Sequence, residues 1–248
     1  APSGSPSGVT WHRTDLLDEV ATHNLIDRLR PTHLLHFAWY AEHCKFWNAA
    51  ANLDWLAATL HLLRRFAEAG GRRFVGAGTC AEYDWTGPAG LMDEGRTPLR
   101  PATLYGAAKA SAFLTGSTYA KSAGVSFAWG RVFHLFGSGE APARLVPALI
   151  RAHVTGTSLE CGRGDVRRDL LPSAMVADAF AHLCAAEAEG PFNIGSGRAT
   201  TLFELSEKIA TLAGSRGTVR FDDVRITAPQ RVLLSMSIAS LEAAVDLT

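Results

Sequence analysis

Short apolar runs alternate with long helical segments along the first half of the chain, and this alternation most constrains the fold. Strands are predicted at residues 32–39, 72–79 and 125–137, and helices between them at 48–69 and 103–122. Gly70-Gly71 ends the first of these helices and Gly124 the second, as glycine commonly does. Strands alternating with helices predict an α/β fold, a doubly wound parallel sheet of the Rossmann-like kind.

The alternation is less regular at both ends of the chain. A short strand over 8–16 and a helix over 18–30 are predicted before the first buried strand. After Gly137 a helix is predicted at 144–155, polar turns at 156–168 and another helix at 174–187. We therefore divide the chain into a Rossmann-like domain, 1–137, and a smaller C-terminal lobe, 138–248, from which 191–194 returns to the sheet.

Composition narrows the class of function. The 248 residues are 47% hydrophobic and 19% charged, which suits one globular unit or a domain with an inserted lobe. With 24 acidic and 24 basic side chains, nothing in the net charge favours binding to nucleic acid or to a membrane surface. The four cysteines are scattered without CxxC or histidine-rich spacing, so we predict no metal site, no disulfide framework and a cytoplasmic location.

The segment LYGAAK, residues 104–109, places a tyrosine and a lysine four residues apart at the predicted start of a helix. Positions i and i+4 share one helix face, so Tyr105 and Lys109 are expected to point the same way. A neighbouring ammonium would lower the pKa of the phenol below its usual value of roughly 10 and make it an acid/base catalyst. The alternative is an ordinary amphipathic helix start.

Possible ligand-binding residues lie at the ends of two predicted strands and at the start of the helix that follows them. Ala38-Trp39 end one strand, Thr79 ends the next, and Tyr105 opens the helix that follows. Ligands of doubly wound sheets bind beyond the carboxyl ends of the strands. A threonine hydroxyl there can hydrogen-bond a substrate oxygen while the tyrosine exchanges its proton. Thr79 alone could equally be a strand-end residue bonded to backbone, but its combination with Tyr105 and Lys109 favours a catalytic site.

Five segments together resemble the extended short-chain dehydrogenase/reductases, the NAD(P)-dependent epimerases, dehydratases and reductases of nucleotide sugars. They are GTCAEY (78–83), TPLRPATLYGAAK (97–109), RVFHLFGSGE (131–140), RRDLL (167–171) and FNIGSG (192–197). The resemblance covers about residues 9 to 215, and the order and spacing of the five segments make it specific. It implies an NAD or NADP cofactor and a nucleotide-diphosphate sugar as substrate.

The resemblance also implies roles for individual residues. Thr79, Tyr105 and Lys109 match the catalytic triad, with Lys109 also binding the nicotinamide ribose. The expected cofactor-binding residues are Asp15, Leu16, Phe37, Ala38, Trp39, Tyr105, Lys109 and Phe133. The expected substrate-binding residues are Cys80, His134, Arg144 and Arg168. Arg168 matches an arginine that commonly binds the substrate diphosphate, and we expect Asp169 to orient it.

The chain departs from the family pattern at its start. The family opens with a strand and a GxxGxxG loop that holds the cofactor pyrophosphate, and this sequence contains neither. The segment GAGTCA (76–81) fits GxGxxA but is better placed as the strand that carries Thr79. We therefore expect the first two βα units of the family to be missing, with APSGSPSG (1–8) as a tag, linker or loop.

Residues next to Thr79 bear on the type of reaction. Sugar 4,6-dehydratases carry Asp-Glu directly after the catalytic threonine, whereas this chain has Cys80-Ala81, which argues against dehydration. GTCAEYD favours a nucleotide-sugar 4-ketoreductase over the alternative, an epimerase. Glu82 is predicted to be a solvated loop charge rather than an orienter of the triad. A non-catalytic cofactor-sensing or interaction protein is the alternative of another class; the missing glycine loop favours it, and the complete triad opposes it.

A homodimer is also expected. The family commonly pairs the two helices that correspond to 48–69 and 103–122. The first of these carries apolar residues on more than one face, including Leu53, Trp55, Leu60 and Phe66, and the surplus suits a partner helix. The alternative is a helix buried between the sheet and an insertion of the same chain.

Overall fold

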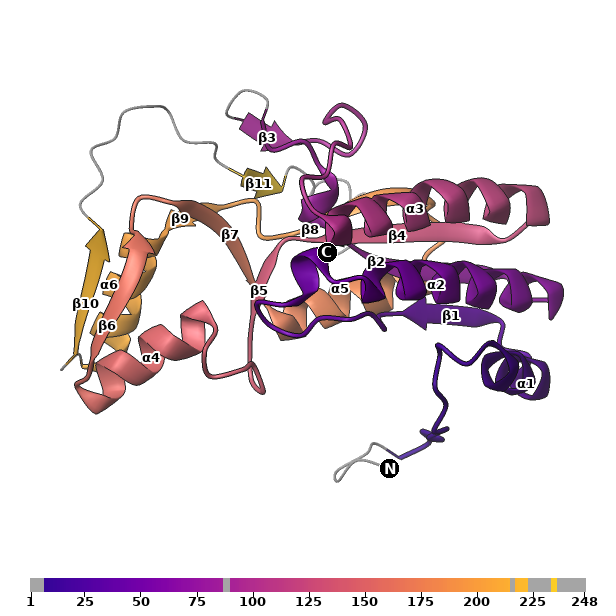
Figure 1. The fold of residues 1–248 in the computed structure, drawn as a ribbon, viewed down its shortest axis with the longest axis horizontal. Helices are drawn as coiled ribbons and strands as arrows, with labels where there is room; N and C mark the ends of the chain where they lie inside the picture. The colour runs from indigo at the N-terminus through magenta and orange to yellow at the C-terminus, as the bar shows by residue number, and fades with distance from the viewer. Residues whose placement is uncertain (1–6, 87–89, 215–216, 223–232, 236–248) are drawn as a thin grey trace.

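The centre of the molecule is a four-stranded parallel sheet (Figure 1). The computed structural model describes residues 7–86, 90–214, 217–222 and 233–235. The sheet order is β1-β2-β4-β8, formed by His33–His36, Arg73–Thr79, Ser126–Val132 and Gly190–Ile194. Every neighbouring pair runs parallel. The predicted Rossmann-like α/β fold is confirmed.

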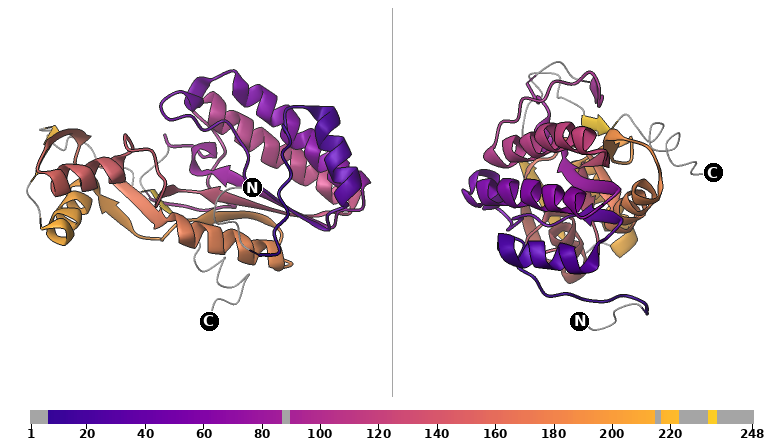
Figure 2. Two further views of the ribbon diagram at one scale, coloured as in Figure 1. Left: turned by 90° about the horizontal axis from the view of Figure 1, so that it is seen from below. Right: turned by 90° about the vertical axis from the view of Figure 1, so that its right-hand side faces the viewer.

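Helices cover both faces of this sheet (Figure 2). On one face lie α2 (Ala51–Glu68) and α3 (Leu104–Ala123), with α1 (Glu19–Leu29) packed on α2. Here the rings of Phe74, Phe127 and Trp129 stack along the sheet. On the other face lies α5 (Ser173–Ala185).

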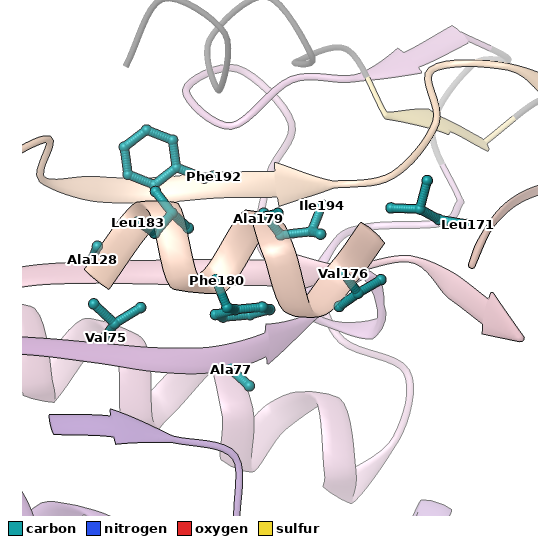
Figure 3. Close-up of a cluster of buried hydrophobic side chains, with 10 residues drawn as sticks. All are labelled: Val75, Ala77, Ala128, Leu171, Val176, Ala179, Phe180, Leu183, Phe192 and Ile194. Carbon is teal, nitrogen blue, oxygen red and sulfur yellow. The ribbon is translucent and has the colours of Figure 1, made fainter. Parts of the chain in front are cut away.

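A second cluster of buried apolar side chains lies between α5 and the sheet. Figure 3 shows Phe180 of this helix lying against the strands, together with Val75, Val176 and Ile194. Phe180 is fully buried. A Cβ at Gly130 on β4 would lie 2.5 Å from the Phe180 ring, so glycine leaves the space that the ring fills.

A smaller lobe lies beyond the carboxyl ends of β4 and β8 (Figure 1). It contains α4 (Leu145–Thr155), α6 (Leu202–Ala213), and the parallel pair β6 (Ser158–Arg163) and β10 (Thr218–Asp222). A three-stranded sheet joins it to the main domain, made of β5 (His134–Phe136), β7 (Arg167–Pro172) and β9 (Ala199–Thr201). The remaining elements are β3 (Gly90–Met92), which pairs with β11 (Leu233–Ser235), and the short 3-10 helices η1 (Phe46–Asn48) and η2 (Cys80–Glu82).

Three predicted elements differ in the structure. Residues 8–16 form no strand, because β1 is the edge of the described sheet and no strand lies beside this segment to pair with it. The strand predicted over 125–137 is divided at Phe133 into β4 and β5. The polar turns predicted over 156–168 contain β6 and the start of β7. Residues 1–6 of the opening segment lie outside the described part of the chain. None of the described helices is both long and apolar enough to cross a membrane.

Candidate active site

The end of β2 and the start of α3 bring Thr79 and Tyr105 together. Thr79 is the last residue of β2, and Thr103 caps α3 by accepting a hydrogen bond from the Gly106 amide at 3.1 Å. A Cβ at position 106 would lie 2.2 Å from the carbonyl oxygen of Ala81, so glycine is required for this close approach. The approach lets the Thr79 hydroxyl hydrogen-bond the Tyr105 phenol.

Aromatic rings cover Tyr105 from the opposite side. Phe46 and Trp47 of η1 contact it edge-on, with ring centroids at 4.8 and 5.9 Å. Burial raises the pKa of Tyr105 to about 12, and the hydrogen bond with Thr79 opposes this only in part. The expectation that Lys109 lowers the pKa of Tyr105 is therefore wrong in this structure. The ammonium of Lys109 is directed elsewhere, and desolvation of the phenolate prevails.

Lys109 is buried, with 3% of its surface exposed. Its Nζ donates a hydrogen bond to the Ala77 carbonyl at 2.7 Å and lies 3.9 Å from the centre of the Trp39 ring. Trp39 is fixed in turn, because its Nε1 donates to Oδ1 of Asn52 at 2.9 Å. Burial lowers the pKa of Lys109 to about 7, and the negative charge of Glu82 acts against this shift. Lys109 can therefore gain or lose a proton near neutral pH.

These three residues line a cavity of about 690 Å³ between the sheet and the smaller lobe. The cavity wall also includes most of the other predicted site residues: Phe37, Trp39, Cys80, Phe133, His134, Arg144 and Arg168. Burial raises the pKa of the Cys80 thiol to about 12, so it lines the cavity as a neutral group.

Three predicted cofactor residues lie outside this wall. Ala38 follows Phe37 but does not line the cavity. Asp15 and Leu16 lie in the turn before α1, where the Asp15 carboxylate accepts a hydrogen bond from the Leu17 amide at 3.0 Å. Leu16 lines a second, smaller hollow of about 370 Å³ between α1 and α2.

The three-stranded joining sheet contributes His134 of β5 and Arg168 of β7 to the cavity. Burial, and secondly the charge of Arg168, lowers the pKa of His134 to about 4, so the ring is neutral at pH 7. Its Nε2 is buried and has no hydrogen-bond partner among the described residues. Burial also lowers the pKa of Arg168, whose Nη1 donates to the Arg167 carbonyl at 2.9 Å.

Asp169, which we expected to orient Arg168, contacts the turn before β9. Its carboxylate accepts hydrogen bonds from the amides of Ser196 and Gly197 at 2.7 and 2.9 Å and so fixes the turn before β9. Neighbouring side chains on a strand point to opposite faces, which separates Arg168 from Asp169 on β7.

Glu82 differs most from its prediction. It is fully buried, not a solvated charge, and its Oε2 accepts a hydrogen bond from Nε of Arg131 at 2.7 Å. Its Oε1 accepts from the Thr79 amide at 2.9 Å, which with the Thr79 side chain forms a capping box on η2. The Thr-x-x-Glu spacing is the sequence signature of such a box and could have revealed the buried position.

Several residues of the cavity wall were not predicted from the sequence, among them Phe46, Trp47 and Glu140. Phe46 and Trp47 come from a segment for which no element was predicted. Glu140 lines the cavity beside Arg144, with 3.6 Å between its Oε1 and Nη1 of the arginine. No motif marked Phe46 and Trp47, and no role was predicted for Glu140 at the end of the segment RVFHLFGSGE. Their places in the wall depend on how η1 and the loop before α4 fold over the sheet.

Comparison with known proteins supports the assignment of the fold and family. Residues 1–195 match the NAD dependent epimerase/dehydratase family. The chain is 28% identical over 168 residues to the Arabidopsis thaliana trifunctional UDP-glucose 4,6-dehydratase/UDP-4-keto-6-deoxy-D-glucose 3,5-epimerase/UDP-4-keto-L-rhamnose-reductase. That match takes in 66% of this chain but spans only a quarter (25%) of the plant enzyme.

Two solved structures are similar over nearly the whole chain. RMD from Pseudomonas aeruginosa, complexed with NADPH, has a TM-score of 0.83 at 24% identity, covering 95% of this chain and 81% of RMD. UDP-glucose 4-epimerase from Thermus thermophilus, complexed with NAD, has a TM-score of 0.78 at 26% identity, covering 96% of this chain and 79% of the epimerase. The chain belongs to the NAD-dependent epimerase/dehydratase family.

Proposed function

We propose that the chain is an NAD(P)-dependent nucleotide-sugar 4-ketoreductase in which Thr79, Tyr105 and Lys109 form the catalytic triad. The observation that carries this proposal is that all three side chains line one cavity at the carboxyl end of β2. Ligands of doubly wound sheets bind at this edge.

The residues of the cavity fit the nicotinamide end of the cofactor. Trp39 and Phe133 offer flat apolar walls, and the buried, unpartnered Nε2 of His134 is a hydrogen-bonding group that a ligand could satisfy. Lys109 would bind the ribose hydroxyls with its ammonium. When bound, NAD(P)H supplies a hydride to the C4 carbon of a keto sugar.

The chain's own residues handle the proton. As hydride reaches C4, the carbonyl oxygen gains an electron pair and needs one proton, which the Tyr105 hydroxyl donates. With its pKa raised to about 12, Tyr105 is protonated at neutral pH and so carries the proton that the reduction needs. Thr79, hydrogen-bonded to Tyr105, would share the sugar oxygen.

An epimerase is the second candidate, because the Thermus UDP-glucose 4-epimerase matches the chain at 26% identity. A non-catalytic binding protein is the third candidate, because the ammonium of Lys109 is already engaged by the Ala77 carbonyl and the Trp39 ring. Cofactor stoichiometry, measured with a UDP-4-keto sugar and with the corresponding UDP-sugar, separates the three. A reductase consumes one NAD(P)H per 4-hydroxy product. An epimerase inverts C4 of a UDP-sugar without net consumption, and a binding protein does neither.

Substrate affinity is expected to depend on Arg168. A nucleotide diphosphate carries about two negative charges, and arginine binds such groups bidentately. Arg168→Ala should therefore raise the apparent KM for a UDP-4-keto sugar at least about tenfold with a smaller effect on kcat, because it removes binding far from the reacting carbon. Arg167→Ala is the matched control, because Arg167 is exposed on the same strand and does not line the cavity. Equal turnover of the free sugar and its nucleotide form would refute this assignment.

A homodimer is proposed to form through α2 and α3, which lie side by side on one face of the sheet (Figure 2). Leu53 on α2 and Leu114 on α3 are 55% and 53% exposed, and both are apolar. Light scattering at micromolar concentration should give twice the mass of the chain. Leu53→Glu/Leu114→Glu should give the monomer mass, whereas Val20→Glu on the exposed face of α1 should not. A monomeric wild type would contradict the proposal.

A further inference from the structure

A buried ion pair lies beside the Thr79 end of β2. The side chains of Glu82 and Arg131 are 0% and 1% exposed, and Nε of Arg131 lies 2.7 Å from Oε2 of Glu82. Burying two charges costs about as much as their attraction returns, so an apolar pair of the same volume would stabilise the fold equally well. The other contacts of the Glu82 carboxylate therefore point to a role beyond stability.

The second carboxylate oxygen contacts the active site directly. Oε1 of Glu82 accepts hydrogen bonds from the Thr79 amide and from Nε1 of Trp129, both at 2.9 Å. Thr79 is the residue whose hydroxyl bonds Tyr105. The ring of Trp129 in turn lies 5.8 Å from Nζ of Lys109. One carboxylate oxygen thus fixes the backbone of Thr79 and a ring next to Lys109.

Arg131 fixes the carboxylate of Glu82 through its Oε2 atom. Its Nη1 donates to the Tyr83 hydroxyl at 3.0 Å, and that hydroxyl donates to Oδ1 of Asn193 at 2.7 Å. The Asn193 amide donates to Oε1 of Glu94 at 2.8 Å. The network crosses β2, β4 and β8, so the carboxylate has little freedom to move.

The charge of Glu82 also reaches Lys109. Burial disfavours the ammonium of Lys109, and Glu82 is the charged group that favours it. The titratable groups around the carboxylate are Arg131 on β4, Cys80 on η2, Tyr83 directly after η2, and Tyr105 and Lys109 on α3. His36 on β1 faces Lys109 from the sheet, and burial lowers its pKa to about 3, so it is neutral. Glu94 lies further along the network, where it accepts a hydrogen bond from the Asn193 amide. With burial keeping Cys80 and the two tyrosines neutral, Arg131 and Lys109 are the cations in this group.

We propose that Glu82 is a positioning residue of the active site: its carboxylate fixes the Thr79 backbone and the Trp129 ring beside Lys109, while Arg131 fixes the carboxylate. The same carboxylate places a negative charge near Lys109, and the titration of Lys109 reports that charge. The inference rests on the proposed function, because Thr79 and Lys109 need this support only if they take part in catalysis.

The titration of Lys109 can be followed directly by NMR with ¹³C-labelled lysine. The chain has four lysines, Lys45, Lys109, Lys121 and Lys208, so the Lys109 signal is assigned by its absence from Lys109→Arg. Glu82→Gln keeps an oxygen for the Thr79 amide but removes the charge. Its Lys109 titration midpoint should fall below that of the wild type. Glu94→Gln, a carboxylate in the same network, is the matched control and should leave the midpoint unchanged.

A second variant covers the case in which Glu82→Gln does not fold. Glu82→Gln/Arg131→Met removes both charges, and it should also lower the Lys109 midpoint, because Glu82 is the member of the pair that raises the pKa of Lys109. An unchanged midpoint in the folded Glu82 variants would overturn the proposal. This readout needs no substrate, so its failure is distinct from a failure of the reductase assignment, which the cofactor stoichiometry measures.

Discussion

Tyr105→Phe should fold like the wild type and lose about 10²-fold or more of its turnover. The substitution removes only the hydroxyl that bonds Thr79 and leaves the ring contacts with Phe46 and Trp47 in place. Without that hydroxyl no side chain donates the proton that the C4 oxygen needs, and general acid catalysis typically contributes about 10²–10⁴-fold. Steady-state kcat, together with the thermal unfolding midpoint, measures both parts of the expectation.

Tyr119→Phe is the matched control, because Tyr119 is a partly buried tyrosine on the same helix and does not line the cavity. Its turnover should equal that of the wild type. Wild-type turnover in Tyr105→Phe would remove the tyrosine from the mechanism and leave the cavity without its proton donor.

Arg131→Met should lower the free energy of unfolding by about 3–5 kcal/mol, the usual cost of removing one partner of a buried ion pair. The substitution leaves the carboxylate of Glu82 fully buried without its cation and also removes the hydrogen bond to the Tyr83 hydroxyl. Urea unfolding at pH 7, followed by tryptophan fluorescence, gives the free energy directly.

The variant Glu82→Gln/Arg131→Met separates charge from packing. With both charges removed, it should recover most of the stability that Arg131→Met loses, because replacing a whole buried pair is often close to neutral. Equal losses in the single and the double variant would show that the arginine stabilises the fold by packing between Tyr83 and Phe113 rather than by pairing with Glu82.

The main sheet and its helices could be predicted because their signals are local. Apolar runs mark β2 and β4, and terminators such as Gly124, in the left-handed conformation at φ 69°, mark where helices end. The strands of the lobe have no such signal. Residues 158–163 are half polar and become β6 only through pairing with 218–222, about sixty residues later in the sequence.

Part of the site could also be predicted from local sequence, and part of it could not. The spacing of Tyr105 and Lys109 predicted their common helix face, and both line the cavity. The direction of the Tyr105 pKa shift could not be predicted, because it depends on burial by η1 and on the turning of the Lys109 ammonium to the Ala77 carbonyl. The burial of Glu82 depends on Arg131, a partner 49 residues away.

Binding of NADPH to the wild type and to Lys109→Met, measured by calorimetry, tests most directly whether the cavity is a nicotinamide site. Lys109→Met keeps a side chain of similar length but removes the ammonium, and a hydrogen bond from a charged donor contributes about 1.5–3 kcal/mol. Affinity should fall about tenfold or more, and turnover should fall with it, while Lys121→Met at the exposed end of α3 should match the wild type. An unchanged affinity for NADPH in Lys109→Met would contradict the placement of the cofactor in this cavity.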